Sequence, residues 1–188
     1  MDASTWAAVY LDTCGLYEKA AALNERTLEQ KEQILGKKHP STLTSMGNLA
    51  LVLGCQGKYE EAERIHRQTL ALRETVLGKK HPDTLTSMNN LASTYWNQGR
   101  WEAERLEVRV TGTRKRVLGA EHPDTLASIY NLAYTWKSQS RNAEAISLMK
   151  DCVELRNQIL GPEHPHTKTS IEVLCGWESE GDKFEHLD

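Results

Sequence analysis

The stretch Leu77-Gly78-Lys79-Lys80-His81-Pro82-Asp83-Thr84-Leu85-Thr86-Ser87-Met88-Asn89-Asn90-Leu91-Ala92 occurs four times in the chain, with substitutions. The copy at Leu35–Ala50 matches it at 14 of 16 positions, the copy at Leu118–Ala133 at 11, and the copy at Leu160–Cys175 at 8. The copies are marked by histidines 42, 41 and 42 residues apart, namely His39, His81, His122 and His164. A fixed period in this range is typical of solenoids, in which each repeat packs against its neighbours. The period therefore predicts a repeat array.

The overall composition and charge indicate which kinds of binding partner to expect. The chain has 188 residues, of which 39% are hydrophobic, and a formal charge of −3 at pH 7. This balance gives no electrostatic support for binding nucleic acid or an anionic membrane. No apolar run approaches the ~18 residues that span a bilayer, and residues 1–6 lack a signal-peptide pattern. We therefore expect a cytoplasmic protein with no nucleic-acid or membrane partner.

The repeat from Pro40 to Gly78 predicts two helices, which we call the A helix and the B helix. Pro40 suits the first position of a helix, where its missing N–H costs nothing. Apolar residues then recur at steps of three and four up to Gly57, which ends the A helix. A second apolar stripe, from Tyr59 to Val76, predicts the B helix, and Gly78 ends it. Two antiparallel helices per repeat follow.

Applied to the whole chain, this plan predicts an all-α solenoid of about nine antiparallel helices. The repeats are expected at 1–36 (truncated), 37–78, 79–119, 120–161 and 162–188 (incomplete). The first A helix is expected within 1–14, and the last from Pro165 to about Trp177. Residues 181–185 resemble the start of a further B helix, so the array looks clipped at both ends and could be a piece of a longer protein.

One repeat departs from the plan. The segment Gly99–Gly119 is one residue shorter than Gly57–Gly78, and Gly112 falls in mid-helix, where glycine costs roughly 1 kcal/mol against alanine. We expect this B helix to be the weakest, with the deletion absorbed in the turn at Gly99-Arg100. In the next repeat, Ser140 stands where a turn glycine is expected.

The four cysteines are interpreted as reduced residues. No Cys-x-x-Cys pair is present, and Cys152 and Cys175 fall where other repeats have small residues. This pattern favours structural roles in a reducing compartment. Cys55 is the exception, because its helical face is expected to be exposed.

The leucine-alanine-x-x-tyrosine pattern of the A helix and the glycine-x-tyrosine-x-x-alanine pattern of the B helix resemble the tetratricopeptide repeat. The 42-residue unit with its Leu-Gly-x-x-His-Pro-x-Thr junction resembles the kinesin light chain variety. The stretch from Asn90 to Trp101 is similar to C-terminal arrays of fungal NB-ARC or NACHT NTPases and patatin-like phospholipases. This resemblance implies a right-handed solenoid of helical hairpins over essentially the whole chain, whose A helices line a concave groove that binds peptides.

The histidines suggest a metal site, but a metal needs its ligands about 2 Å from one centre. Equivalent residues of stacked helices lie roughly 8–10 Å apart or further. We therefore interpret the histidines as residues that cap or pack the start of each A helix. His164 and His166 could hold a stray metal, although two ligands make a poor site. No phosphate-binding loop, His-Glu-x-x-His or Gly-x-Ser-x-Gly motif is present, so we expect no cofactor, no metal and no enzymatic activity.

The predicted site is the stripe of each A helix that is offset from its leucines. Asparagines at equivalent positions would form a series along the groove, and an asparagine amide can pair with the backbone of an extended peptide. Nearby aromatic residues and one lysine would add anchors. The candidates are Asn48, Thr86, Asn89, Asn90, Ser93, Trp96, Asn97, Tyr130, Asn131, Tyr134 and Lys137. Alternatively, the asparagines bond within and between helices and hold the array together.

Two functions remain open from the sequence. The first is a non-catalytic scaffold that binds a protein or peptide partner, whose identity is unknown, in the groove. The alternative is a sensor or self-association segment of a larger signalling NTPase, in which the repeats pack on each other or on an upstream domain.

Overall fold

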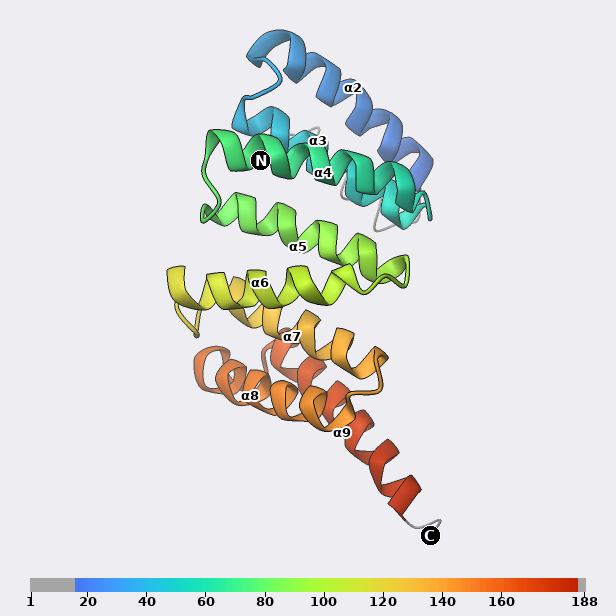
Figure 1. Cartoon of the computed structure of the whole chain (residues 1–188), viewed down its shortest axis with the longest axis vertical. Helices are drawn as coiled ribbons and strands as arrows, with labels where there is room; N and C mark the ends of the chain where they lie inside the picture. Colours follow the sequence, from blue (N-terminus) through green and yellow to red (C-terminus); the bar gives the residue numbers. More distant parts are fainter. Residues whose placement is uncertain (1–15, 186–188) are drawn as a thin grey trace. The chain divides into compact units, whose positions relative to one another are not determined.

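The computed structural model describes the backbone of residues 16–185 and the side chains of residues 16–180. Within this part of the chain, every regular element is an α-helix (Figure 1). The eight described helices are α2 (Tyr17–Leu35), α3 (Pro40–Cys55), α4 (Tyr59–Val76), α5 (Pro82–Asn97), α6 (Glu102–Val117), α7 (Pro123–Ser138), α8 (Asn142–Leu160) and α9 (Pro165–Glu185). The predicted all-α fold is confirmed, and the helix expected within residues 1–14 lies outside the described residues.

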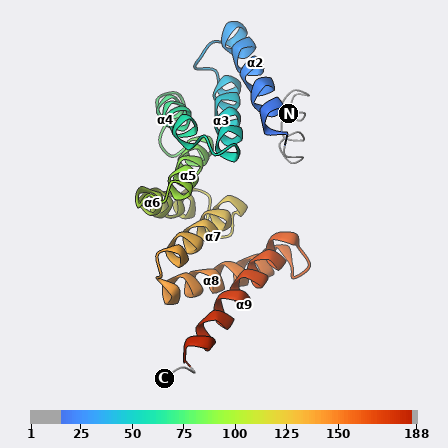
Figure 2. The ribbon, with the colours of Figure 1, turned by 90° about the vertical axis from the view of Figure 1, so that its right-hand side faces the viewer.

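The chain divides into two units between Ala103 and Glu104. In unit 1, each helix from α2 to α5 packs against the next, and the A helices α3 and α5 also touch. Unit 2 contains α6 from Glu104 onward and α7 to α9, with α7 packed on α8 and α8 packed on α9 (Figure 2). Both units are therefore built from the predicted helical hairpins. None of the described helices is both long enough and apolar enough to cross a membrane.

Proline and glycine set the helix boundaries, as the sequence predicts. The A helices α3, α5 and α7 each begin at the proline that follows the junction histidine. The B helices α2 and α8 end at Gly36 and Gly161, whose φ angles of 86° and 84° lie in the left-handed region that glycine reaches without strain. The turn between α7 and α8 has the same conformation at Ser140, with φ 63°.

The missing residue of the third repeat is absorbed in the first turn of α6 and not in the turn at Gly99-Arg100, which keeps the backbone hydrogen bonds of Gly57-Lys58. In the regular repeat, the Ala62 N–H donates to the oxygen of Lys58, four residues back. In the shortened repeat, the equivalent Ala103 N–H donates to the oxygen of Arg100, only three residues back. The first turn of α6 is therefore tighter, and Ala103 is as buried as Ala62. One lost residue thus leaves the inward face of the helix in register.

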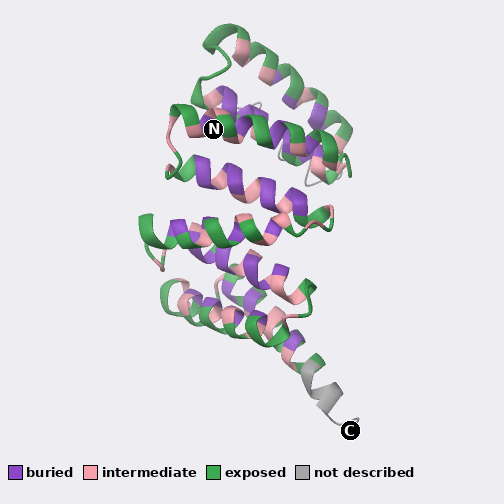
Figure 3. Ribbon diagram, in the orientation of Figure 1, coloured by how far each residue is buried: buried purple, intermediate pink, exposed green. Residues whose placement is uncertain are grey.

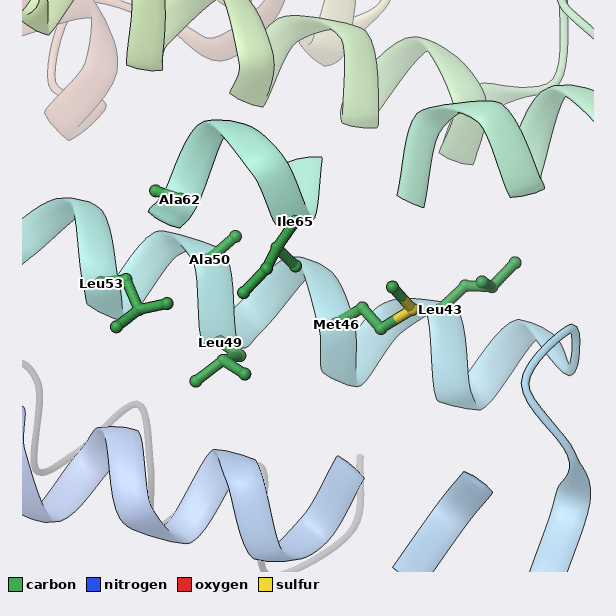
Figure 4. Packing of buried hydrophobic residues seen from close by; sticks show 7 residues of the cluster. All are labelled: Leu43, Met46, Leu49, Ala50, Leu53, Ala62 and Ile65. Atoms are coloured by element: carbon green, nitrogen blue, oxygen red, sulfur yellow. The ribbon is translucent and has the colours of Figure 1, made fainter. Parts of the chain in front are cut away.

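The core of unit 1 lies between α3 and α4. Leucines at steps of three and four on α3 gather with Met46 and Ala50 of the same helix and with Ala62 and Ile65 of α4 (Figure 4). The cluster is Leu43, Met46, Leu49, Ala50, Leu53, Ala62 and Ile65. Buried and exposed residues alternate along each helix with helical spacing (Figure 3). Burial of one such side chain stabilises the fold by about 2 kcal/mol, so this cluster contributes to the stability of unit 1.

The core of unit 2 joins three helices. Leu126, Ile129 and Ala133 of α7 pack with Met149 of α8, and Trp177 of α9 completes the cluster. Cys152 belongs to the same cluster and is fully buried, which confirms its predicted structural role.

The end of the described chain corrects two predictions. Helix α9 continues to Glu185, so residues 181–185 do not begin a separate B helix. Ion pairs hold its last turns on the neighbouring helices: Lys150 binds Glu178 and Lys137 binds Glu180. Cys175 is exposed, although it stands where Ala50 is buried. Ala50 packs with the following helix, α4, whereas α9 is the last helix that the structure describes.

Candidate functional site

The four junction histidines cap the A helices. Nδ1 of His39, His81 and His122 accepts a hydrogen bond of 3.1–3.2 Å from the backbone N–H two residues later. His164 makes the same bond to the N–H of His166. The bond satisfies one of the donors that every helix start leaves unpaired. The predicted capping role is confirmed. Among the described residues, no three His, Cys, Asp or Glu side chains could hold a metal ion together.

A buried cation of the preceding B helix locks each junction. Arg73 of α4 donates to the backbone oxygen of Asp83 and to Ser87 Oγ, at 2.8 and 2.9 Å. Arg114 and Arg156 repeat both bonds ten and fourteen residues further along the chain. In the first junction, Lys31 takes the same place and donates to Ser45 Oγ. The cation thus fixes the start of the next A helix.

The predicted site residues of unit 1 form one polar face on α3 and α5. Asn48, Thr86, Asn89, Asn90 and Ser93 are half-buried, and Asn97 is exposed. Trp96 at the end of α5 has 43% of its surface exposed. Some of these groups also bond within their own helix: Ser93 Oγ donates to the Asn89 backbone oxygen, and Thr86 Oγ1 to that of Pro82.

The predicted site residues of unit 2 pack against one another and against α9. The rings of Tyr130 and Tyr134 lie 4.9 Å apart, and the Tyr130 hydroxyl donates to that of Tyr134. Tyr134 meets Trp177 edge to face at 5.1 Å. Lys137 is mostly buried and forms a 3.0 Å ion pair with Glu180. Asn131, which lies between Tyr130 and Tyr134 in sequence, is half-buried. These aromatic residues therefore join helices as well as line a surface.

Burial alters the chemistry of Tyr130. Its partial burial, and then the hydrogen bond with Tyr134, raise the pKa of its phenol well above the ordinary value. The Arg156 guanidinium lies 5.0 Å from the centre of its ring and opposes this rise. Tyr130 is therefore a neutral hydrogen-bond donor at physiological pH.

A second polar position recurs inside the B helices, and inspection of single motifs misses it. One period apart stand Asn24, His66, Glu107 and Met149, and all four are buried. The only sequence signal is the alignment of the repeats, because the slot is apolar in just one copy. Glu107 is 3% exposed, and no described residue bonds its Oε2 atom.

The two ionisable residues in this slot shift in opposite directions. Burial, and then the nearby Arg73 guanidinium, lower the pKa of His66 to about 4. Burial raises the pKa of the Glu107 carboxyl to about 7, a hydrogen bond with Thr135 opposes the rise, and the Glu104 carboxylate adds to it. In both cases the dominant cause is the loss of water around the charged form.

Two protein-family models match the sequence. A model described as "Tetratricopeptide repeat" matches residues 2–75 and 55–106, and a second model of the same description matches residues 125–166. Together they cover well over half of the sequence. The chain belongs to the tetratricopeptide repeat family. Tetratricopeptide repeats generally mediate protein–protein interactions, the fold is typically a non-catalytic scaffold, and no enzyme family is indicated.

Solved structures agree with this family. Two crystal structures from Podosopora anserina, described as a kinesin light chain with nearly identical TPR-like repeats, are each 28% identical, with a TM-score of 0.79. The alignment covers 97% of this chain and 87% of theirs. BtubC (BKLC) from P. vanneervenii, at 19% identity, has a TM-score of 0.78 over 95% of this chain and 71% of its own, which shows the fold alone. A search of curated proteins gave no match. The similarity to fungal NTPases and patatin-like phospholipases stays a prediction.

Proposed function

We propose that this tetratricopeptide repeat protein is a non-catalytic scaffold that binds an extended polypeptide along its A helices. The observation that carries the proposal is the polar face of α3 and α5. Asn48 and Asn90 stand at equivalent positions of adjoining A helices and are partly accessible. A primary amide donates and accepts at once, so it can pair with a peptide backbone whatever the side chains are.

Capture of interacting proteins from cell extract, followed by competition with synthetic fragments of each captured protein, tests this proposal. We expect Asn48→Ala/Asn90→Ala to weaken capture by about tenfold or more, because each lost amide removes hydrogen bonds worth about 1 kcal/mol. The matched control is Asn157→Ala, which removes an exposed asparagine from the B helix α8. Unchanged capture by a double variant with normal helix content would overturn the proposal.

A second candidate function is self-association, or packing on a further domain of a larger protein. It is supported by an exposed aliphatic residue that recurs at the end of every described B helix: Ile34, Val76, Val117 and Ile159. Ile34 has 80% of its surface exposed. Sedimentation over a range of concentrations tests it. We expect association that Ile34→Ser/Val76→Ser reduces, and a monomer at every concentration would count against this candidate.

A further inference from the structure

Charge is segregated between the two kinds of helix in unit 1. The B helices α2 and α4 carry seven charged residues each. The A helix α3 carries none, and α5 carries one, Asp83 in its first turn. Charged residues ordinarily occupy the solvent side of a surface helix. The A helices of unit 1 therefore lack the charged side chains that ordinarily keep an exposed helical face well hydrated.

This uncharged surface is accessible. Leu51 on α3 and Trp96 on α5 are 44% and 43% exposed, and Thr44, Cys55 and Asn97 are exposed as well. At Gly47, a methyl group would meet no atom within 4 Å, so the backbone of α3 is open to a close approach. We call these residues, with Asn48, Asn89, Asn90 and Ser93, the neutral face.

The cations that contact α3 and α5 from the preceding B helices are engaged in hydrogen bonds: Lys31 donates to Ser45, and Arg73 makes several bonds. Arg73 is buried, and its guanidinium donates to the Asp83 backbone oxygen, to Ser87 and to Thr44 Oγ1. Burial lowers the pKa of the Arg73 guanidinium, and the nearby Asp83 carboxylate opposes this shift. Apart from Asp83 in the first turn of α5, the described residues of α3 and α5 offer a partner no charged side chain.

We propose that the neutral face binds an extended polypeptide segment that has no charged side chain where it contacts α3 and α5. This inference rests on the proposed function and names the partner's chemistry. A charged side chain would lose its hydration on this face and find no counter-ion, which disfavours it. Uncharged segments lose nothing comparable: their backbone pairs with the asparagine amides, and an apolar side chain contacts Leu51 or Trp96.

The equivalent surface of unit 2 has different chemistry. Glu172 of α9 stands where unit 1 has Gly47 and Asn89, and it is exposed. Lys137 of α7 and Glu180 of α9 form an ion pair. The absence of charge is therefore a property of unit 1 and not of the repeat.

The test uses the full chain and a displayed library of random linear peptides. We expect the enriched sequences to be depleted of Asp, Glu, Lys and Arg. Their affinity should change less than about twofold between about 0.05 and 0.5 M NaCl, because ion pairs are absent. Asn48→Ala/Asn90→Ala should weaken binding about tenfold or more.

Charge placement supplies the matched control. Ser93→Lys should shift the selection towards acidic peptides, whereas Gln68→Lys, on the exposed side of α4, should leave it unchanged. Peptides that depend on Asn48 and Asn90 but are strongly charged and salt-sensitive would overturn this inference and leave the proposed function intact. A library from which nothing is enriched, or only peptides indifferent to both asparagines, would overturn both.

Discussion

Units 1 and 2 share their junctions and differ in their surfaces. In both, a histidine caps the A helix and a buried arginine of the preceding helix holds its first turns. In unit 1 the A helices show amides and hydroxyls, whereas in unit 2 they show tyrosines packed on Trp177 and an ion pair. The comparison shows that the scaffold and the surface depend on separate positions of the repeat.

The units also differ inside. The recurring buried slot of the B helices holds Asn24 and His66 in unit 1 and Glu107 and Met149 in unit 2. The residue in this slot differs in polarity from repeat to repeat, while leucines and alanines form the hydrophobic clusters of both units. Each of the following changes tests whether a given feature belongs to the repeat or to one unit.

The largest effect is expected at the aromatic cluster of unit 2. Trp177→Ala should lower the free energy of unfolding by about 4 kcal/mol, since the ring is 8% exposed and a cavity replaces it. Hydrogen exchange should accelerate in α7 to α9. Trp96→Ala, which removes an exposed ring in unit 1, should cost less than about 1 kcal/mol. Equal costs for both variants would contradict the proposed difference between the two surfaces.

Because both units share the same junction, we expect its loss to lower the free energy of unfolding equally in both. Arg73→Ala and Arg114→Ala should each cost about 3 kcal/mol, because each leaves a serine hydroxyl and a backbone oxygen without its donor. Urea unfolding measures the cost, and Arg64→Ala, on the exposed side of α4, is the control. A difference well above 1 kcal/mol between the two variants would show that the junction is not equivalent in the two units.

The polar slot predicts opposite responses to pH. The folded pKa of Glu107, about 7, lies above its unfolded value of 4.5, so unit 2 loses stability as pH rises from 4.5 through 7. The folded pKa of His66, about 4, lies below 6.5, so unit 1 loses stability as pH falls from 6.5 through 4. Each effect amounts to about 3 kcal/mol.

Glu107→Gln should therefore stabilise unit 2 at pH 8 by about 3 kcal/mol and make little difference near pH 4. His66→Asn should remove the acid sensitivity of unit 1. Hydrogen exchange of α4 and α6 at several pH values resolves the two units, and Glu172→Gln, on an exposed side chain, is the control. Parallel pH profiles for α4 and α6 would refute the assignment.

The smallest effect is expected at the turn between α7 and α8. Ser140 has a left-handed φ of 63°, which costs a residue with a Cβ about 1 kcal/mol. Ser140→Gly should stabilise unit 2 by about 0.5 kcal/mol after the larger unfolded-state entropy of glycine is included. Gly57→Ser in unit 1, at φ 77°, should destabilise by a similar amount. Changes of the same sign at both positions would contradict this strain.

Local rules made the helix boundaries predictable. The prolines after the histidines and the glycines at the helix ends act over a few residues, and the structure confirms the helix boundaries that they predict. The one-residue deletion before Ala103 also acts locally. Long-range contacts were not predictable. Helix α9 continues past Gly181 and is joined to Lys137 and Lys150 by ion pairs, and these two residues lie more than twenty positions away in sequence. The exposure of Cys175 likewise depends on tertiary packing, since Ala50 is covered by α4 and α9 is the last helix that the structure describes.

The candidate site was predictable in part. Helical spacing placed Asn48, Asn90 and Trp96 on accessible sides of A helices, and the structure agrees. The contact of Tyr134 with Trp177 was missed, because it depends on how α7 and α9 meet. Spacing gives the side of a helix but not the neighbour that covers it.

The junction arginines bear on how such an array is copied. The side chain that secures an A helix is encoded some ten residues before it, in the previous sequence repeat. Copying any whole period of 42 residues, from wherever it starts, keeps every internal lock with its partner. The heritable module is therefore the period itself, and the array can change its copy number without inventing a new interface.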